Sequence, residues 1–168
     1  MDTDADGMRR HRRELMSKLD EQVGSISGGR VERGIDELRL FLHREVLPLA
    51  DADDLHLRPA VERVSGRGLE TSSMSLDCEV TRRYVNDVEE IMYKLETGAR
   101  RDDRAQLEAE LIEKATRLQA VVELLVERES RIYLPLLEEH LSEDELREIL
   151  RAMVEEPRVI RLPDSERV

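Results

Sequence analysis

Apolar residues recur along this chain in steps of three and four, the spacing of one helix face. The first such segment runs from about Ala5 to Val23, and a stretch rich in serine and glycine, 24–29, ends it. The pattern therefore predicts an amphipathic first helix. Its expected inward stripe is Met8, His11, Leu15, Leu19 and Val23.

The second segment starts near Val31 and contains two prolines. Apolar spacing resumes at Leu49, so Pro48 should kink this helix rather than end it. Its end is predicted at Pro59 or at the cluster 65–68. The inward positions are Ile35, Leu38, Leu42, Leu49, Ala52 and Asp53.

Two further long helices and a short one follow. The third should begin at Ser72 or Ser73, either of which can cap a helix, and should stop at Gly98. Its inward face is Met74, Cys78, Thr81, Val85, Val88, Met92 and Leu95. The fourth should run from about 102–103 to just before Pro135. Its inward face is Leu107, Leu111, Leu118, Val121, Leu125, Glu129 and Ile132.

A capping box, Ser142-Glu-Asp-Glu145, predicts the short fifth helix, with Leu146, Ile149, Leu150 and Met153 inward. Four long amphipathic helices joined by short loops predict an all-α fold, an up-down-up-down four-helix bundle with a short C-terminal fifth helix. The expected organisation is a flexible acidic N-terminus at 1–7, one bundle domain at 8–155 and a loosely ordered tail at 156–168.

Composition narrows the class of protein. The 168 residues are 39% charged and 39% apolar, with a net charge of −12, so a main partner that is nucleic acid or an anionic membrane is not expected. No apolar run is long enough to span a membrane, and the N-terminus lacks an export signal. The single cysteine, Cys78, suits a reducing cytoplasm. A cytoplasmic protein is therefore expected.

One skeleton occurs twice. Leu49 and Leu125 are each followed after four residues by a carboxylate, Asp53 or Glu129, and six residues later by a proline. Leucine and carboxylate then share a helix face, about 6 Å apart along the axis. A carboxylate repeated on an apolar face suggests an internal polar site.

In the predicted topology, four inward polar residues meet at one end of the core. They are His11, Asp53, Cys78 and Glu129, one from each long helix. Such side chains are plausible ligands of iron or zinc, and bundle cores are where such sites are built. A metal-free alternative remains open, in which His11 pairs with a carboxylate and Cys78 is a small buried apolar residue.

Two stretches also resemble the hemerythrin-like (HHE cation-binding) family. They are 41–54, FLHREVLPLADADD, and 128–137, RESRIYLPLL, within a match over roughly 8–155. The resemblance implies a four-helix bundle around a non-haem di-iron centre, with a histidine four residues before each of two glutamates. It also implies one histidine early in the first helix and one early in the third.

Several of the implied ligands are replaced. His11 and Glu129 match, whereas Asp53 stands for a glutamate and Cys78 for a histidine. Leu49 and Leu125 stand where the resemblance implies histidines, and leucine cannot bind a metal. His56, three residues after Asp53, is a candidate compensating ligand.

The sequence therefore predicts a non-enzymatic binding or regulatory module with a degenerate, metal-poor site and no assigned cofactor. No nucleophile–base pair, phosphate loop or cofactor fingerprint points to catalysis. The alternative is a metal-binding or oxygen or redox sensor that uses His11, Asp53, Cys78 and Glu129 with a non-haem iron or zinc ion. The expected partner is an unidentified protein or a second copy of the chain.

Overall fold

The computed structural model describes residues 4–29, 31–66, 68–98 and 100–155, and within them it contains helices and no strand. The expected all-α class is therefore confirmed. The predicted tail, 156–168, and residues 1–3 lie outside the described residues. None of the described helices is long and apolar enough to cross a membrane.

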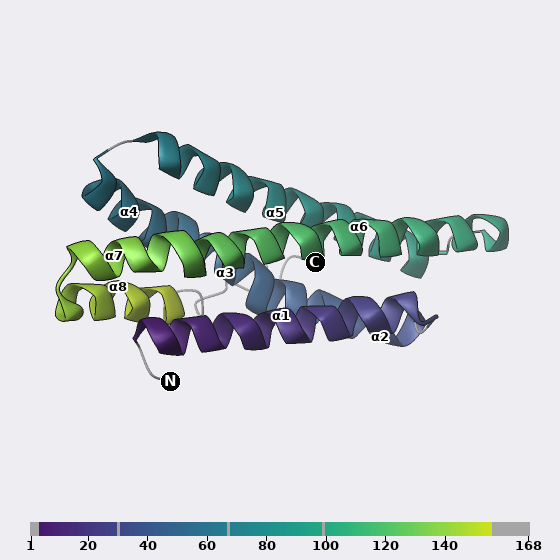
Figure 1. Cartoon of the computed structure of the whole chain (residues 1–168). Coiled ribbons are helices and arrows are strands. Elements are labelled where there is room, and N and C mark those ends of the chain that lie inside the picture. The colour runs from purple at the N-terminus through teal and green to yellow at the C-terminus, as the bar shows by residue number, and fades with distance from the viewer. Residues whose placement is uncertain (1–3, 30, 67, 99, 156–168) are drawn as a thin grey trace, which may run out of the picture.

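The helices form four long rods and one short helix (Figure 1). Rod one is α1 (Ala5–Ser27), and rod three is α5 (Gly68–Glu96). Rod two joins α2 (Val31–Phe41), η1 (Leu42–Val46), α3 (Leu47–Ala52), η2 (Asp53–Leu57) and α4 (Arg58–Ser65). Rod four joins α6 (Arg101–Arg128), η3 (Glu129–Tyr133) and α7 (Leu134–His140). The short helix is α8 (Glu143–Glu155).

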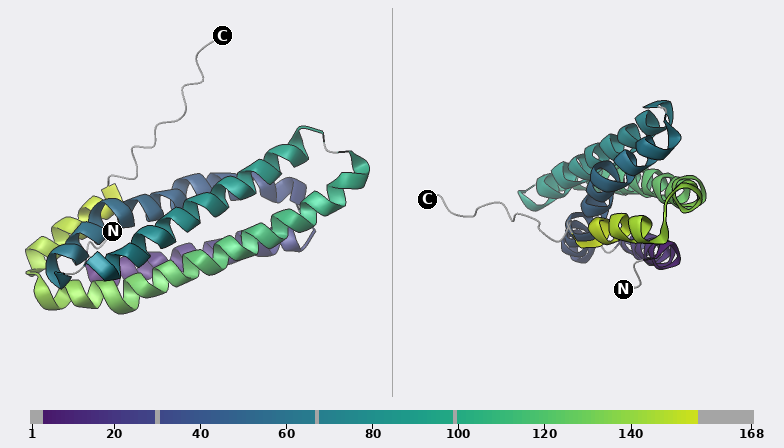
Figure 2. Two further views of the ribbon diagram at one scale, coloured as in Figure 1. Left: turned by 90° about the horizontal axis from the view of Figure 1, so that it is seen from above. Right: turned by 90° about the vertical axis from the view of Figure 1, so that its left-hand side faces the viewer.

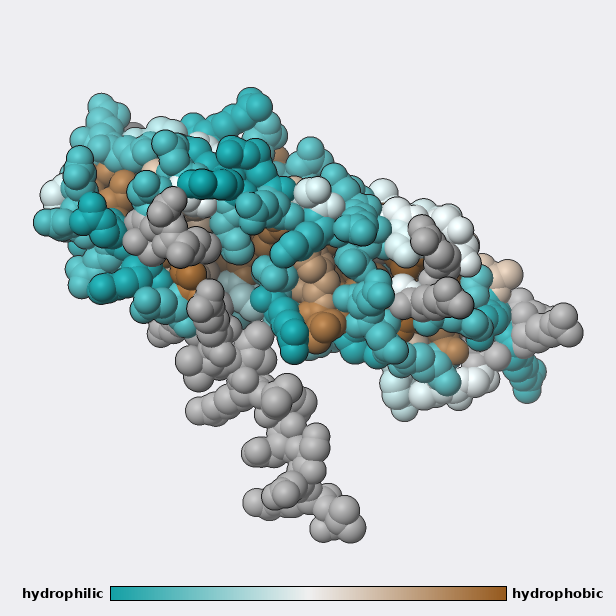
Figure 3. All heavy atoms as spheres, turned by 90° about the horizontal axis from the view of Figure 1, so that it is seen from below, coloured by the Kyte–Doolittle hydropathy of each residue, from teal (hydrophilic) through white to brown (hydrophobic). Residues whose placement is uncertain are grey.

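The rods lie side by side along the molecule (Figure 2). The helices α5 and α6 make the most extensive contact, and α1 packs on both α2 and α6. The short α8 lies against η2, α3, α7 and α1, at the end of the molecule where α1 begins (Figure 1). The underside carries mainly hydrophilic residues, with small hydrophobic areas between them (Figure 3).

Residue Asp4 caps the first helix. The Asp4 carboxylate accepts a 2.6 Å hydrogen bond from the Gly7 amide and caps α1, and Ala5 and Gly7 are buried. The segment expected to be flexible, 1–7, therefore overlaps the first turn of α1. The start at Ala5 is confirmed, but α1 continues four residues past Val23, to Ser27.

Three of the rod segments are π-helical turns, and each one leads into a proline. They are η1, η2 and η3, which precede Pro48, Pro59 and Pro135 by two residues. In each turn the residue before the proline donates its N–H to a carbonyl five residues back. Proline has no N–H, and its ring clashes with the carbonyl four residues back, so a wider turn lets the helix continue.

These turns decide one predicted end and correct another. Of the two ends predicted for rod two, the structure has the later one: the rod passes Pro59 and reaches Ser65, where Gly66 takes a left-handed conformation with φ 64°. Rod four does not stop before Pro135 but continues to His140. The third helix also begins earlier than predicted, at Gly68 rather than Ser72 or Ser73.

The wider turn at η3 also changes which residue faces inward. Ile132, predicted to be inward, is 54% exposed, and Tyr133 is buried in its place. One extra residue in the turn rotates the following residues by about 100° relative to an α-helix. The predicted stripes of rods two and three are buried throughout.

The capping box predicted before α8 is confirmed. The Glu145 carboxylate accepts hydrogen bonds from the Ser142 amide (3.0 Å) and hydroxyl (2.7 Å). The Ser142 hydroxyl in turn accepts a 3.4 Å bond from the Glu145 amide. This fixes the first turn of α8, whose Leu146, Leu150 and Met153 pack into the core.

The buried apolar residues form two clusters rather than one. The larger cluster fills the rods from Leu15 to the α5–α6 end. The smaller one joins the start of α1 to η2, α4, α7 and α8. Three charged side chains are buried where rods one, two and four pass from one cluster to the other: Arg12, Asp53 and Glu129.

Candidate functional site: a buried charge cluster

The charge cluster consists of Arg12 from α1, Asp53 from η2 and Glu129 from η3. The three residues are 4%, 3% and 0% exposed. The Nε–H of Arg12 donates to both oxygens of Glu129, at 3.1 Å to Oε1 and 2.8 Å to Oε2. Arg12 Nη2 lies 3.5 Å from Asp53 Oδ1. One guanidinium therefore faces two carboxylates from different rods.

The π-helical turns help to position both carboxylates. Asp53 is the first residue of η2 and Glu129 is the first residue of η3. Each accepts, through its backbone carbonyl, the N–H of a residue five positions on, Arg58 or Leu134. The repeated leucine–carboxylate–proline skeleton thus corresponds to a repeated backbone geometry.

The contact with Asp53 is incomplete. Arg12 Nη2 and Asp53 Oδ1 are both buried, and neither makes a hydrogen bond within the described part of the chain. Their 3.5 Å separation is within ion-pair range but exceeds ordinary hydrogen-bond lengths. Arg12 is consequently bound more closely to Glu129 than to Asp53.

Burial has the largest effect on the pKa of both carboxyl groups. Burial raises the pKa of Asp53 well above 3.8, and the Glu129 charge raises it further, although Arg12 opposes both. Burial also raises the pKa of Glu129, against the lowering effect of Arg12. One positive charge balances one carboxylate, so Asp53 is the group that favours its protonated form.

Arginines outside the cluster pair with the neighbouring aspartates. Arg82 from α5 lies 2.9 Å from Asp51 and 3.3 Å from Asp54, and it donates to the Ala50 carbonyl at 3.3 Å. Arg58 bonds Asp54 at 2.9 Å. Within the acidic stretch 51–54, Asp53 is therefore the carboxylate that turns inward.

His11 does not occupy the predicted inward position. The buried residue on this turn of α1 is Arg12, and His11 is half-buried beside it. Burial lowers the pKa of His11, and the adjacent Arg12 charge lowers it further. The stripe Met8, Arg12, Leu15 fits helical spacing as well as Met8, His11, Leu15 does. Spacing alone thus does not distinguish Arg12 from His11, and a buried arginine is rare without a partner.

Cys78 is buried in the core seam of α5, as predicted, and it is a free thiol. Burial and the nearby charges of Asp53 and Asp54 raise its pKa to about 12. Its thiolate, the form that reacts and binds metals, is therefore disfavoured. His56 lies further along η2, at a surface pocket of about 400 Å³ between α4 and α8.

A metal centre does not fit these residues. In the described ranges, no three histidine, cysteine or acidic side chains are arranged to hold a metal ion. Leu49 and Leu125, at the positions where the resemblance implies histidines, are packed in the larger apolar cluster. The cation that faces Asp53 and Glu129 is a guanidinium, which has donors only and cannot ligate a metal.

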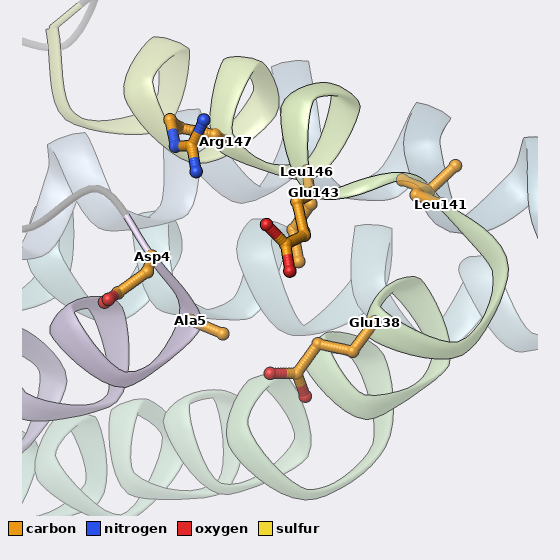
Figure 4. Close-up of a pocket in the computed structure, with 7 residues that line it drawn as sticks. All are labelled: Asp4, Ala5, Glu138, Leu141, Glu143, Leu146 and Arg147. Carbon is orange, nitrogen blue, oxygen red and sulfur yellow. The ribbon is translucent and has the colours of Figure 1, made fainter.

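A separate surface pocket of about 430 Å³ lies between the start of α1, α7 and α8 (Figure 4). Its lining includes three carboxylates and one arginine: Asp4, Glu138, Glu143 and Arg147. Arg9 already pairs with Glu138 at 2.7 Å, and Arg147 with Asp144 at 2.9 Å. No residue predicted as a ligand lines this pocket.

Comparison of the chain with protein-family models found no matching family, and searches of curated proteins and of solved structures found no significant match.

Proposed function

We propose that this chain is a hemerythrin-like, up-down-up-down four-helix bundle with a degenerate, metal-poor site, which acts as a non-enzymatic binding or regulatory module. The observation that carries the proposal is the burial of Leu49 and Leu125, which are 2% and 5% exposed. Their isobutyl groups occupy core space where the resemblance implies two imidazole ligands. A site without these two donors would bind iron weakly.

The charge cluster supports the same proposal. Arg12 faces both carboxylates that the resemblance assigns to iron, so a metal would have to compete with a positively charged side chain. A redox or metal sensor built on His11, Asp53, Cys78 and Glu129 gains less support. His11 is only half-buried beside Arg12, and the raised pKa of Cys78 disfavours its thiolate.

The proposed partner is a protein or a second copy of this chain. The net charge of −12 disfavours duplex nucleic acid and anionic membranes. A cytoplasmic location is part of the proposal, because the single cysteine is a free, buried thiol. Sedimentation over a range of concentrations would distinguish self-association from a requirement for another protein.

Metal analysis tests the central claim. Protein expressed with iron supplementation should contain far less than one iron or zinc per chain. Its Tm should not change when Fe²⁺, Zn²⁺ or a chelator is added, because a ligand that binds only the native state must raise stability. One or two irons per chain, or a fall in Tm with chelator, would contradict the proposal.

A further inference from the structure

The buried carboxyl groups of Asp53 and Glu129 need a cation or a proton to compensate their burial, whatever the role of the protein. Both side chains are essentially inaccessible to solvent. Asp53 lies in rod two and Glu129 in rod four, so the two residues are 76 positions apart in the sequence (129 minus 53). Removing a charge from water without a partner is costly, so buried carboxylates pair, bind a cation or take up a proton.

Arg12 meets this need from within the chain. Its Nε–H points between the two Glu129 oxygens, and its Nη2 faces Asp53. A planar guanidinium can face two carboxylates at once, because its donors lie in one plane and point in different directions. Arg12 Nη2 and Asp53 Oδ1 are both buried and without a hydrogen bond among the described residues, so this part of the core is strongly polar.

We propose that Asp53 and Glu129 form a cation-binding site whose resident cation is the Arg12 guanidinium, held where a metal ion would otherwise be needed. The site takes a small planar monovalent cation and supplies it from α1. It therefore links rod one to rods two and four at the boundary between the two apolar clusters. This inference rests on the cluster geometry alone and is independent of the proposed function.

Shortening Arg12 should open the site to external cations. In the full chain, Arg12→Ala should lower Tm by on the order of 10 °C, because it leaves the buried Glu129 carboxylate without its counter-charge beside a second buried acid. Methylguanidinium chloride should then raise the Tm of this variant in a concentration-dependent way, since a ligand of the native state stabilises it. Sodium chloride at equal concentration reports the effect of ionic strength.

Arg9→Ala is the matched control. Arg9 lies one turn earlier on α1 and pairs with Glu138 and Asp6 at the surface. An exposed ion pair contributes little, so this variant should lose about 4 °C at most and should not respond to methylguanidinium. The wild-type chain should not respond either, because its own guanidinium fills the site.

The same Tm measurements are repeated with Zn²⁺ in place of methylguanidinium. A rise in Tm confined to Arg12→Ala would support a cation site, and an equal rise in the wild-type chain would overturn the inference. It would also be overturned if Arg12→Ala were as stable as Arg9→Ala, or if methylguanidinium gave no rescue. Iron content tests the proposed function separately, so the two failures are distinguishable.

Should Arg12→Ala prevent folding, the variant to measure is Arg12→Ala/Asp53→Asn/Glu129→Gln. This variant has no charge left in the cluster and should fold, without any response to methylguanidinium. If it also failed to fold, Arg12 would act through packing rather than as a cation, and the inference would fall.

Discussion

Replacing the whole charge cluster by apolar side chains should stabilise the protein. The variant is Arg12→Met/Asp53→Leu/Glu129→Met, which keeps unbranched or γ-branched side chains suited to helices. Arg12→Met alone is the comparison. The two variants should change the free energy of unfolding in opposite directions.

The magnitudes follow from the burial of the cluster. All three residues are at most 4% exposed, so each charge has lost nearly all of its hydration. Removing one partner of such a buried group costs about 3–5 kcal/mol, whereas replacing the group entirely by packed apolar residues often gains about 1–4 kcal/mol. For a chain of this size, each kcal/mol shifts Tm by about 2–4 °C.

Arg12→Met should therefore lower Tm by about 6–20 °C, and the triple variant should raise it by about 2–16 °C. Urea unfolding monitored by circular dichroism would give both free energies, and an unchanged m-value would show that the same surface is exposed. A triple variant as unstable as Arg12→Met would refute the reasoning, because it would mean that the cluster stabilises the fold rather than merely compensating its own burial.

Three further outcomes are expected. Because the folded pKa of Asp53 is raised above 3.8, its contribution is complete below that pH and is lost as the pH rises through the folded pKa. Asp53→Asn, which cannot titrate, should gain stability relative to wild type as the pH rises, in urea titrations at several pH values. Cys78, whose pKa burial raises to about 12, should be alkylated much more slowly in the native state than in urea, as followed by mass spectrometry. Leu49→Ala should cost about 2–5 kcal/mol in urea unfolding, whereas Leu40→Ala, at a half-exposed position on α2, should cost far less; equal losses would contradict the packing described for Leu49.

The sequence predicted the helices well because their apolar faces are long and regular. The α5 stripe, from Met74 to Leu95, is buried at every position predicted. Because α5 packs against α6 and rod two, its buried face has to follow the helical spacing. The predicted meeting of Asp53 and Glu129 is also confirmed, since Arg12 contacts both.

The cation between them could not be identified in the same way. His11 and Arg12 are neighbours, and both satisfy a spacing of three or four residues from Met8 and Leu15. Which of the two faces inward depends on the buried carboxylates of rods two and four that pair with Arg12. That pairing belongs to the tertiary structure and not to the spacing along α1. Histidine is buried more often than arginine, so the sequence favoured His11 at the inward position. The pairing with two carboxylates places Arg12 there instead.

The π-helical turns were missed for a related reason. A proline within a helical pattern indicates a local disruption but does not say whether the chain kinks, ends or widens. The skeleton also occurs a third time, as Leu38, Leu42 and Pro48, with leucine in place of the carboxylate. Its recurrence before η1 shows that the proline, and not the acid, accompanies the turn.

Each π-helical turn amounts to one residue inserted into a continuous helix. Rod two contains two such insertions and rod four contains one, so the inward stripe of each rod advances out of step with a uniform 3.6-residue repeat. In rod four this extra residue turns Ile132 outward and brings Tyr133 into the core, so the inward positions after η3 differ from those of an uninterrupted helix. The helical phase after a turn of this kind therefore has to be found from the residues that follow it.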